Sequence, residues 1–265
     1  AFLTGLALRA LPTLVKRIIG GRNAEPGFFP WQALIVVEDT SRVPNDRWFG
    51  SGALLSESWV LTAAHVLRSQ RRDNTLTASF DIQNYNHDIA LVKLKEKVTM
   101  GPYIMPVCVP QDPRESGGPQ PNMLGLVAGW GISNPNTLSD VLQYVKLPVV
   151  LHEECKTSYE SRSGNYSVTE NMFCAGYYEG GKDTCLGDSG GAFVIRDLDN
   201  QRWVAQGLVS WGGPEECGSK QVYGVYTKVS NYVDWLQEKT GKFKILLEIE
   251  AGVVVTPVLQ VILDF

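Results

Sequence analysis

Three side chains of the kinds that support nucleophilic catalysis stand in short, distinctive segments of this chain. His65 ends the run Leu-Thr-Ala-Ala-His, Asp88 lies in His-Asp-Ile-Ala-Leu, and Ser189 lies in Gly-Asp-Ser-Gly-Gly. A serine hydroxyl is a poor nucleophile unless a neighbouring base accepts its proton, and an imidazole can do so near neutral pH. A carboxylate can then hold the imidazole tautomer and stabilise the imidazolium. The three residues therefore indicate a serine nucleophile that is activated by histidine.

The order of these segments, together with a fourth one, carries a resemblance to a known family. The chain order histidine, aspartate, serine is that of the chymotrypsin-type triad, whereas subtilisins and α/β-hydrolases use other orders. With the run Arg17-Ile18-Ile19-Gly20-Gly21, these segments resemble the chymotrypsin/trypsin family of serine proteases over residues 18 to about 239. Residues 18–39, 126–136 and 184–235 are more closely similar to the protease domain of the mannan-binding lectin-associated serine proteases of complement.

The resemblance implies how a substrate would be bound. Main-chain N–H groups of Gly187 and Ser189 would receive the oxyanion that develops during the reaction. Asp183 would lie at the base of the primary specificity pocket, where a carboxylate favours the cationic tip of Arg or Lys. The strand that pairs with substrate backbone and the open walls of the pocket would be formed by Ser210, Trp211, Gly212 and Gly224. The implied partners are protein substrates cleaved after Arg or Lys, and no cofactor is implied.

Activation also follows from the resemblance. Cleavage after Arg17 would free the amino group of Ile18, which would turn inward and pair with Asp188. A buried charge without its partner is costly, so this ion pair would act as a nearly two-state switch. We therefore expect the uncut chain to be a zymogen.

The five cysteines indicate disulfides rather than a metal site. The sequence has no Cys-x-x-Cys pair and only three histidines, so no metal is expected. By resemblance, Cys155 pairs with Cys174 and Cys185 pairs with Cys217. Cys108 matches a cysteine that joins the protease domain to upstream heavy-chain modules; a free thiol is the alternative. Contacts with lectin recognition proteins would come only from such modules, which this chain lacks.

Composition narrows the compartment and the partners. The 265 residues carry a net charge of −4 with no basic run, which argues against nucleic acid as a partner. No apolar run is long enough for a membrane-spanning helix. Asn165-Tyr166-Ser167 is an N-glycosylation sequon. The first residues lack the pattern of a signal peptide, so we expect a part of a longer secreted protein.

The distribution of strand-like runs predicts an all-β fold. Short β-type runs separated by turn residues are typical of a sandwich or barrel, and the resemblance specifies two antiparallel Greek-key barrels. We expect strands in residues 32–37, 48–55, 89–94, 124–129, 142–150, 192–195 and 203–210. Val229 to Thr240 has helical spacing with Ser230 as a possible N-cap, so it predicts a closing helix. The expected organisation is an activation segment (1–17), a protease domain (18–240) and an atypical apolar tail (241–265).

Two departures from the family pattern bear on activity. Gly50 and Val66 stand where most members have a disulfide that braces the catalytic histidine, although some complement proteases lack it. His65 and Asp88 are 23 residues apart, against about 45 in the type enzyme. Only one strand-like run, Thr75 to Ile82, lies between them, so we expect an incomplete first barrel with an open edge. The alternative to an enzyme is therefore a catalytically impaired, protease-like binding module. The tail could add a strand or be disordered.

Overall fold

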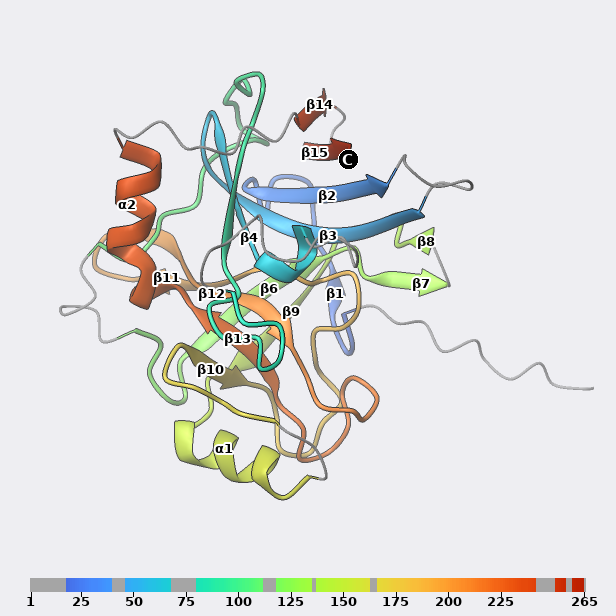
Figure 1. The fold of residues 1–265 in the computed structure, drawn as a ribbon, viewed down its shortest axis with the longest axis vertical. Helices are drawn as coiled ribbons and strands as arrows, with labels where there is room; N and C mark the ends of the chain where they lie inside the picture. Colours follow the sequence, from blue (N-terminus) through green and yellow to red (C-terminus); the bar gives the residue numbers. More distant parts are fainter. Residues whose placement is uncertain are drawn as a thin grey trace, which may run out of the picture.

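Two curled β-sheets form the body of the protein, with one helix below them and another along the left side in Figure 1. The computed structural model describes residues 18–39, 46–67, 80–111, 118–134, 137–162, 166–241, 251–255 and 259–264. The architecture is mostly β with two half-barrel sheets and a C-terminal helix, as the sequence predicts.

The first sheet contains the strands that lead to His65 and Asp88. Its order is β14-β15-β2-β3-β4-β5, and neighbours from β2 to β5 are antiparallel. The four core strands are β2 (Gln32–Asp39), β3 (Asp46–Ser56), β4 (Trp59–Thr62) and β5 (Ala90–Lys93). Most of β2 is buried on both of its faces, since Ala33 and Ile35 as well as the successive residues Val36 and Val37 are fully inaccessible.

The second sheet is entirely antiparallel, with the order β1-β9-β6-β11-β12-β13-β10. Its strands are β1 (Arg22–Asn23), β9 (Gln143–Pro148), β6 (Leu124–Gly129), β11 (Ala192–Asp197), β12 (Arg202–Trp211), β13 (Gly224–Lys228) and β10 (Met172–Ala175). A separate ladder joins β7 (Ile132–Asn134) to β8 (Thr137–Leu138). The predicted strand runs all fall within observed strands or overlap them.

Helices are few and short. A 3₁₀ turn, η1 (Ala64–Leu67), follows β4, and α1 (His152–Glu160) follows β9. The predicted closing helix is divided into a 3₁₀ turn, η2 (Val229–Tyr232), and α2 (Val233–Gly241). The prediction of Ser230 as an N-cap is wrong, because Ser230 lies buried inside η2 and Lys228 precedes the turn without a side-chain cap. The prediction omitted α1, of whose nine residues only Cys155 and Tyr159 are buried.

The tail forms a hairpin that extends the first sheet. β14 (Ala251–Val255) pairs antiparallel with β15 (Leu259–Asp264), and β15 pairs with β2 over six residues, from Leu259 opposite Ala33 to Asp264 opposite Glu38. This last pairing is parallel, which departs from the expected antiparallel first barrel. The β2 side of the first sheet is therefore paired with the tail, and of the tail's two alternatives the structure adopts the added strand (Figure 1).

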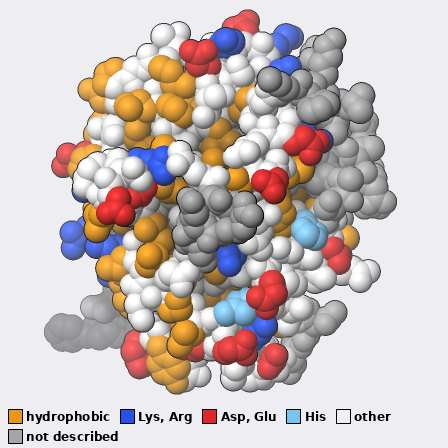
Figure 2. All heavy atoms as spheres, turned by 90° about the vertical axis from the view of Figure 1, so that its left-hand side faces the viewer, with side chains coloured by type: hydrophobic (Ala, Val, Ile, Leu, Met, Phe, Trp, Pro, Cys, Tyr) orange, Lys and Arg blue, Asp and Glu red, His pale blue; other side chains and the backbone are white. Residues whose placement is uncertain are grey.

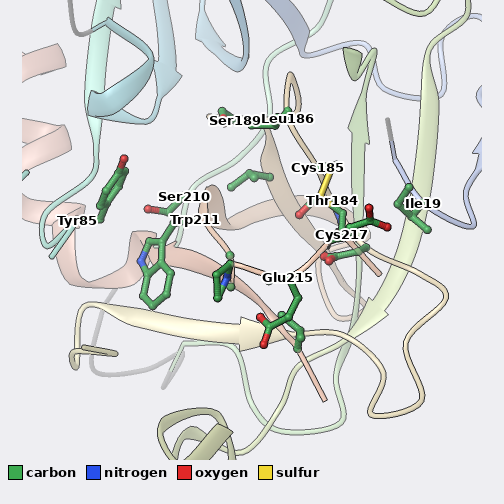
Figure 3. A pocket seen from close by; sticks show the side chains of 18 of the residues that line it. Ile19, Tyr85, Thr184, Cys185, Leu186, Ser189, Ser210, Trp211, Glu215 and Cys217 are labelled. Carbon is green, nitrogen blue, oxygen red and sulfur yellow. Dashed lines mark hydrogen bonds between the residues drawn. A yellow bond between two sulfur atoms is a disulfide. The ribbon is translucent and has the colours of Figure 1, made fainter. Parts of the chain in front are cut away.

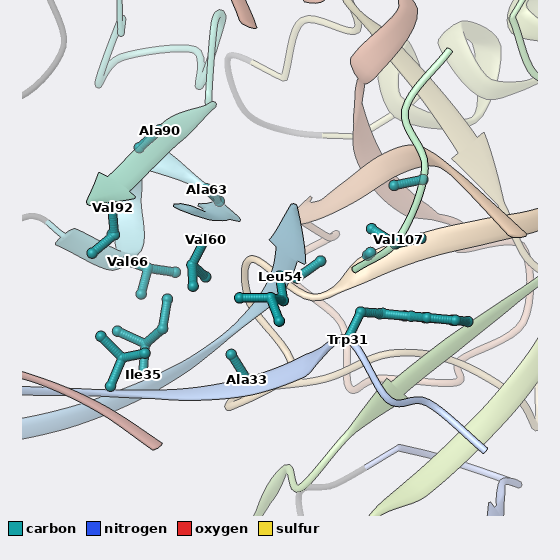
Figure 4. Packing of buried hydrophobic residues seen from close by; sticks show 14 of the residues in the cluster. Trp31, Ala33, Ile35, Leu54, Val60, Ala63, Val66, Ala90, Val92 and Val107 are labelled. Carbon is teal, nitrogen blue, oxygen red and sulfur yellow. The ribbon is translucent and has the colours of Figure 1, made fainter. Parts of the chain in front are cut away.

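The largest buried cluster lies between the strands of the first sheet and reaches the second (Figure 4). Ile35, Leu54 and Val60 are fully buried in it, and so is Val261 of β15. Trp31 and Val107 extend the cluster toward Ala205 of the second sheet. Close packing of this kind fixes the relative position of the two sheets. The strand-like run Thr75 to Ile82 lies mostly outside the described residues; its last part forms only an isolated bridge between Asp81 and Asn86.

Candidate active site

His65 is carried on η1, directly after the buried strand β4. The main-chain N–H of Val66 donates to the carbonyl of Ala63, and the indole N–H of Trp48 donates to the carbonyl of Val66 at 2.8 Å. The side chain of Val66 packs directly against the main chain of Gly50, since a Cβ added at Gly50 would lie only 2.5 Å from Val66 Cγ1. The two positions without the family's disulfide thus lie in contact, and van der Waals packing holds the turn that carries His65.

Asp88 contacts His65 through both of its carboxylate oxygens. Oδ1 accepts the main-chain N–H of His65 at 2.8 Å, and Oδ2 lies 2.7 Å from Nδ1 of the imidazole. The Asp88 side chain is fully buried, whereas about a fifth of the His65 side chain is exposed. The short segment between the two residues therefore still brings the carboxylate to the imidazole.

Asp88 is also held by the second sheet. The hydroxyl of Ser210 in β12 donates to Oδ2 at 2.5 Å, and the hydroxyl of Thr227 in β13 donates to the main-chain carbonyl at 2.8 Å. A buried carboxylate needs such donors because its charge is costly to remove from water. The arrangement leaves Nε2 of His65 as the ring nitrogen that can face a nucleophile.

Ser189 lies in a tight turn between the two sheets. Its carbonyl accepts the N–H of Ser51 at 2.7 Å, and the N–H of Gly190 donates to Val209 at 2.9 Å. Gly190 has φ of 79°, and a Cβ there would lie 2.2 Å from the Thr62 hydroxyl, so only glycine fits. Ser189 and His65 line the same cavity, but no hydrogen bond joins their described side chains. Such catalytic contacts are often long in sites without substrate.

A cavity of about 530 Å³ opens beside Ser189 and His65. Figure 3 shows Tyr85 and Trp211 on one side of it, and Ile19 with the Cys185–Cys217 disulfide on the other. Asp183, Ser210, Gly212 and Gly224 also line it, so the structure brings together the residues expected to bind substrate. A Cβ at Gly212 would meet no atom within 4 Å, because it would project into open space.

Asp183 is buried and held by main-chain donors. Its Oδ1 accepts the N–H of Thr184 at 2.8 Å, and its Oδ2 accepts the N–H of Gly218 at 2.9 Å. Burial raises the pKa of this carboxyl to about 6, although the two N–H donors oppose the shift. No Lys or Arg among the described residues pairs with it. A cationic side chain entering the cavity would therefore find a carboxylate that lacks a counter-ion.

Asp188, next to the serine, is fully buried and faces inward. Its Oδ2 accepts the N–H of Cys185 at 3.0 Å, and its Oδ1 accepts the N–H of Gly131 at 3.2 Å. Burial raises the pKa of Asp188 to about 7. The Ile18 side chain is also buried, at 2% exposure, and the next residue, Ile19, exchanges two main-chain hydrogen bonds with Asp183.

Comparison with known proteins decides the family. The sequence profile described as Trypsin matches residues 18–236, which is most of the chain. The chain belongs to the trypsin family. It is a trypsin-family serine endopeptidase domain, as the order of its catalytic segments predicts.

Two similar relatives are blood-clotting proteins of horseshoe crabs. Clotting factor C of Tachypleus tridentatus and Limulus clotting factor C of Carcinoscorpius rotundicauda are each 35% identical over 260 residues, covering 83% of this chain. The chain spans only about 25% of the length of either relative. These comparisons show the trypsin family, but they do not single out the complement proteases to which the sequence analysis pointed.

Both disulfides that the trypsin-family resemblance implied are present, Cys155–Cys174 between α1 and β10 and Cys185–Cys217 beside the cavity. Cys108 is partly buried and makes no disulfide with a described cysteine. Arg17, the expected cleavage residue, and Asn165, the expected glycosylation site, lie outside the described residues.

Sequence reasoning missed one residue of this trypsin-family site. Tyr85 lines the cavity, and its ring centroid lies 5.6 Å from that of His65. On the same side of the cavity, Trp211 packs against Tyr159 and Tyr166, at 4.9 and 6.1 Å between ring centroids. The only sequence signal for Tyr85 is an aromatic residue three positions before Asp88, and only the folded loop shows that it reaches the cavity.

Other kinds of site find little support in the part of the chain that the structure describes. It contains no group of three or more metal-binding side chains, and no helix long and apolar enough to cross a membrane. On the face shown in Figure 2, the visible Lys and Arg side chains are scattered among acidic ones rather than gathered into a basic patch. The described residues visible on this face therefore form no phosphate-binding stripe.

Proposed function

We propose that this chain is an active serine endopeptidase that cleaves protein substrates after Arg or Lys. The observation that carries the proposal is the double contact of Asp88 with His65, at 2.8 and 2.7 Å, in the cavity that Ser189 lines. A shortened segment between the two residues would disable catalysis if it separated imidazole and carboxylate. Their contact favours the enzyme over a binding module.

The proposed reaction follows from the roles of these three side chains. His65 Nε2 accepts the hydroxyl proton of Ser189 as Oγ attacks the scissile carbonyl, and Asp88 stabilises the resulting imidazolium. Main-chain N–H groups of Gly187 and Ser189 stabilise the oxyanion, each by about 3–4 kcal/mol. The imidazolium then gives its proton to the leaving amine, which leaves an acyl-enzyme. Water attacks this ester by the same proton transfers and restores the Ser189 hydroxyl.

Specificity for Arg or Lys rests on Asp183. Its carboxylate is buried and lacks a cationic partner among the described residues, so it offers a long cationic side chain a charge-assisted hydrogen bond. Gly212 and Gly224 leave the walls of the cavity open. A substrate with Phe or Leu before the cleaved bond would place an apolar group against the buried Asp183 carboxylate, which costs binding energy.

Activation by cleavage at Arg17–Ile18 is the second part of the proposal. Asp188 is buried without a counter-ion among the described residues, and Ile18, the first described residue, is also buried. A new ammonium at Ile18 would supply the missing charge and fix the turn around Gly187. We infer that the uncut chain is a zymogen.

The proposed setting is an extracellular proteolytic cascade. Two disulfides favour an oxidising compartment. The relatives' names place them in clotting, and the sequence resemblance points to the lectin pathway of complement. We also propose that Cys108 forms its disulfide with an upstream segment.

Incubating the cut enzyme with candidate cascade zymogens and identifying the new N-termini would test the proposed setting in a proteolytic cascade. Cleavage confined to bonds without Arg or Lys would contradict it.

The decisive experiment separates an enzyme from a binding module. A fluorophosphonate probe should label the cut chain stoichiometrically at Ser189, and the uncut chain or Ser189→Ala should stay unlabelled. The cut chain should also hydrolyse Arg and Lys peptides and spare matched Leu peptides. A cut, folded chain that takes up no probe would be a binding module, and equal hydrolysis before and after cutting would reject the zymogen.

A further inference from the structure

Three consecutive residues attach the loop that carries Asp88 to the second sheet and to the segments that adjoin its strands. Asp88 is bonded to Ser210 and Thr227, and His87 Nδ1 lies 3.0 Å from the Tyr232 hydroxyl of η2. The third attachment is Asn86, whose partners belong to the turn before β10. Residues 80–89 of this loop form no strand, so the strands of the first sheet include the chain only from Ala90, where β5 begins.

Asn86 binds the turn before β10 through one atom, its side-chain oxygen. Oδ1 accepts the hydroxyl of Thr169 at 2.9 Å and the amide Nδ2 of Asn171 at 3.1 Å. The orientation of the Asn171 amide is fixed from its other end, since its Oδ1 accepts Nδ2 of Asn231 at 3.0 Å. Because Thr169 and Asn171 both donate to the same oxygen, they restrain the Asn86 side chain in two directions.

The turn that receives Asn86 is itself part of the second sheet. The carbonyl of Asn171 accepts the N–H of Lys228, at the end of β13, at 2.8 Å. Thr227, the preceding residue of β13, holds the carbonyl of Asp88. Asn86 and Asp88, two residues apart, are therefore fastened at the same end of the neighbouring strands β10 and β13, where Met172 lies opposite Thr227.

We propose that Asn86 is a positioning residue, which through Thr169 and Asn171 fixes the Asp88 carboxylate against His65. The expected effect on kcat rests on the proposed function, whereas the expected effect on the position of the Asp88 carboxylate does not. In this chain the second sheet sets the place of the catalytic acid, and this explains how the acid keeps its contact after only 23 residues. Asn86 touches neither the substrate cavity nor the reacting atoms.

The test uses Asn86→Ala with two readouts. The first is the low-field proton NMR resonance of the hydrogen bond between His65 Nδ1 and Asp88 Oδ2, recorded in a Ser189→Ala background so that turnover is irrelevant. We expect this resonance to broaden or shift in Asn86→Ala. The second is hydrolysis of an Arg peptide by the cut chain: kcat should fall about 10-fold with KM changed less than twofold, since sub-ångström misplacement of a catalytic group has effects of this order.

Matched variants separate positioning from general loop stability. Asn84→Ala is the control, because Asn84 Oδ1 accepts only the N–H of Asn86 within the same loop, at 2.9 Å. It should leave the resonance and kcat within twofold of the parent. Asn86→Asp retains an accepting side-chain oxygen at this position, so its resonance and its kcat should both match those of the parent. Thr169→Val removes one of the two donors to Asn86 Oδ1. Combining it with Asn86→Ala should lower kcat little further, because both variants remove the same contact.

The outcomes decide the proposal in each case. An unchanged resonance in Asn86→Ala, or equal effects of Asn84→Ala and Asn86→Ala, would overturn it. If Asn86→Ala does not fold, the resonance in Thr169→Val decides in the same way. A perturbed resonance in a chain whose parent shows no hydrolysis would support the positioning role and reject the proposed enzymatic function.

Discussion

Val261 in the tail lies opposite Ile35 in the parallel pairing of β15 with β2, and both side chains are fully buried. The next tail residue, Ile262, is only partly buried. The tail thus contributes to the main core through one face of its strand, and it supplies main-chain partners to an edge of the first sheet that would otherwise be unpaired. Unpaired apolar edges promote association between chains.

We predict that the tail strand stabilises the protease domain. Val261→Asp places a carboxylate in the core and should lower the free energy of unfolding by about 3 kcal/mol or more. Ile262→Asp, on the other face of the same strand, is the matched control and should cost less than half as much. Urea unfolding monitored by tryptophan fluorescence measures both. Equal, small effects would mean that β15 does not pack on β2 in solution.

The binding of Arg substrates should depend on the ionisation of Asp183. Burial raises the pKa of its carboxyl to about 6, so the carboxyl is ionised above this pH and protonated below it. KM for an Arg peptide should therefore rise about 10-fold between pH 7 and pH 5. Asp183→Asn should show a high KM with no such rise. A KM that falls on acidification would contradict the assignment.

The open wall of the cavity should be sensitive to side-chain volume at one glycine. Gly212→Val projects into the cavity and should reduce kcat/KM for Arg peptides by at least about 10-fold. Gly101→Val is the matched control, because a Cβ at Gly101 also meets no atom within 4 Å but lies outside the cavity. Similar losses for both variants would show a general effect on folding instead of a narrowed pocket.

The uncut chain should lose stability as Asp188 ionises. Burial raises the pKa of this carboxyl to about 7 in the folded chain, above its ordinary value of 3.8. The folded state therefore binds the proton more tightly, so the free energy of unfolding falls as pH rises from about 4 to 7. The contribution is at most about 4 kcal/mol.

A comparison of uncut and cut chains measures this contribution. In a Ser189→Ala background, the fall in unfolding free energy between pH 4.5 and 7.5 should be smaller in Asp188→Asn than in the parent. Cutting after Arg17 should also reduce the fall, because the Ile18 ammonium would stabilise the ionised carboxylate. Identical pH profiles for the uncut and cut parent would reject the proposed ion pair.

Local sequence was sufficient for the strands and for the family. Short apolar runs such as Gln32 to Val37, which are rich in β-branched residues and bounded by turn residues, are typical of buried strands. The segments around His65, Asp88 and Ser189 are equally local, since each one is a short run of consecutive residues. The order of these segments identified the chemistry and the trypsin family before any contact was known.

Only the tertiary structure decided whether the shortened chain assembles this site. The spacing of His65 and Asp88 suggested an open first barrel, but it could not show that β15 returns from the far end of the chain to pair with β2. Nor could it show that Asn86, His87 and Asp88 are fastened to residues between about 80 and 145 positions away. Sequence patterns encode which face of an element is apolar, whereas the partner across a distant contact depends on how the whole chain packs.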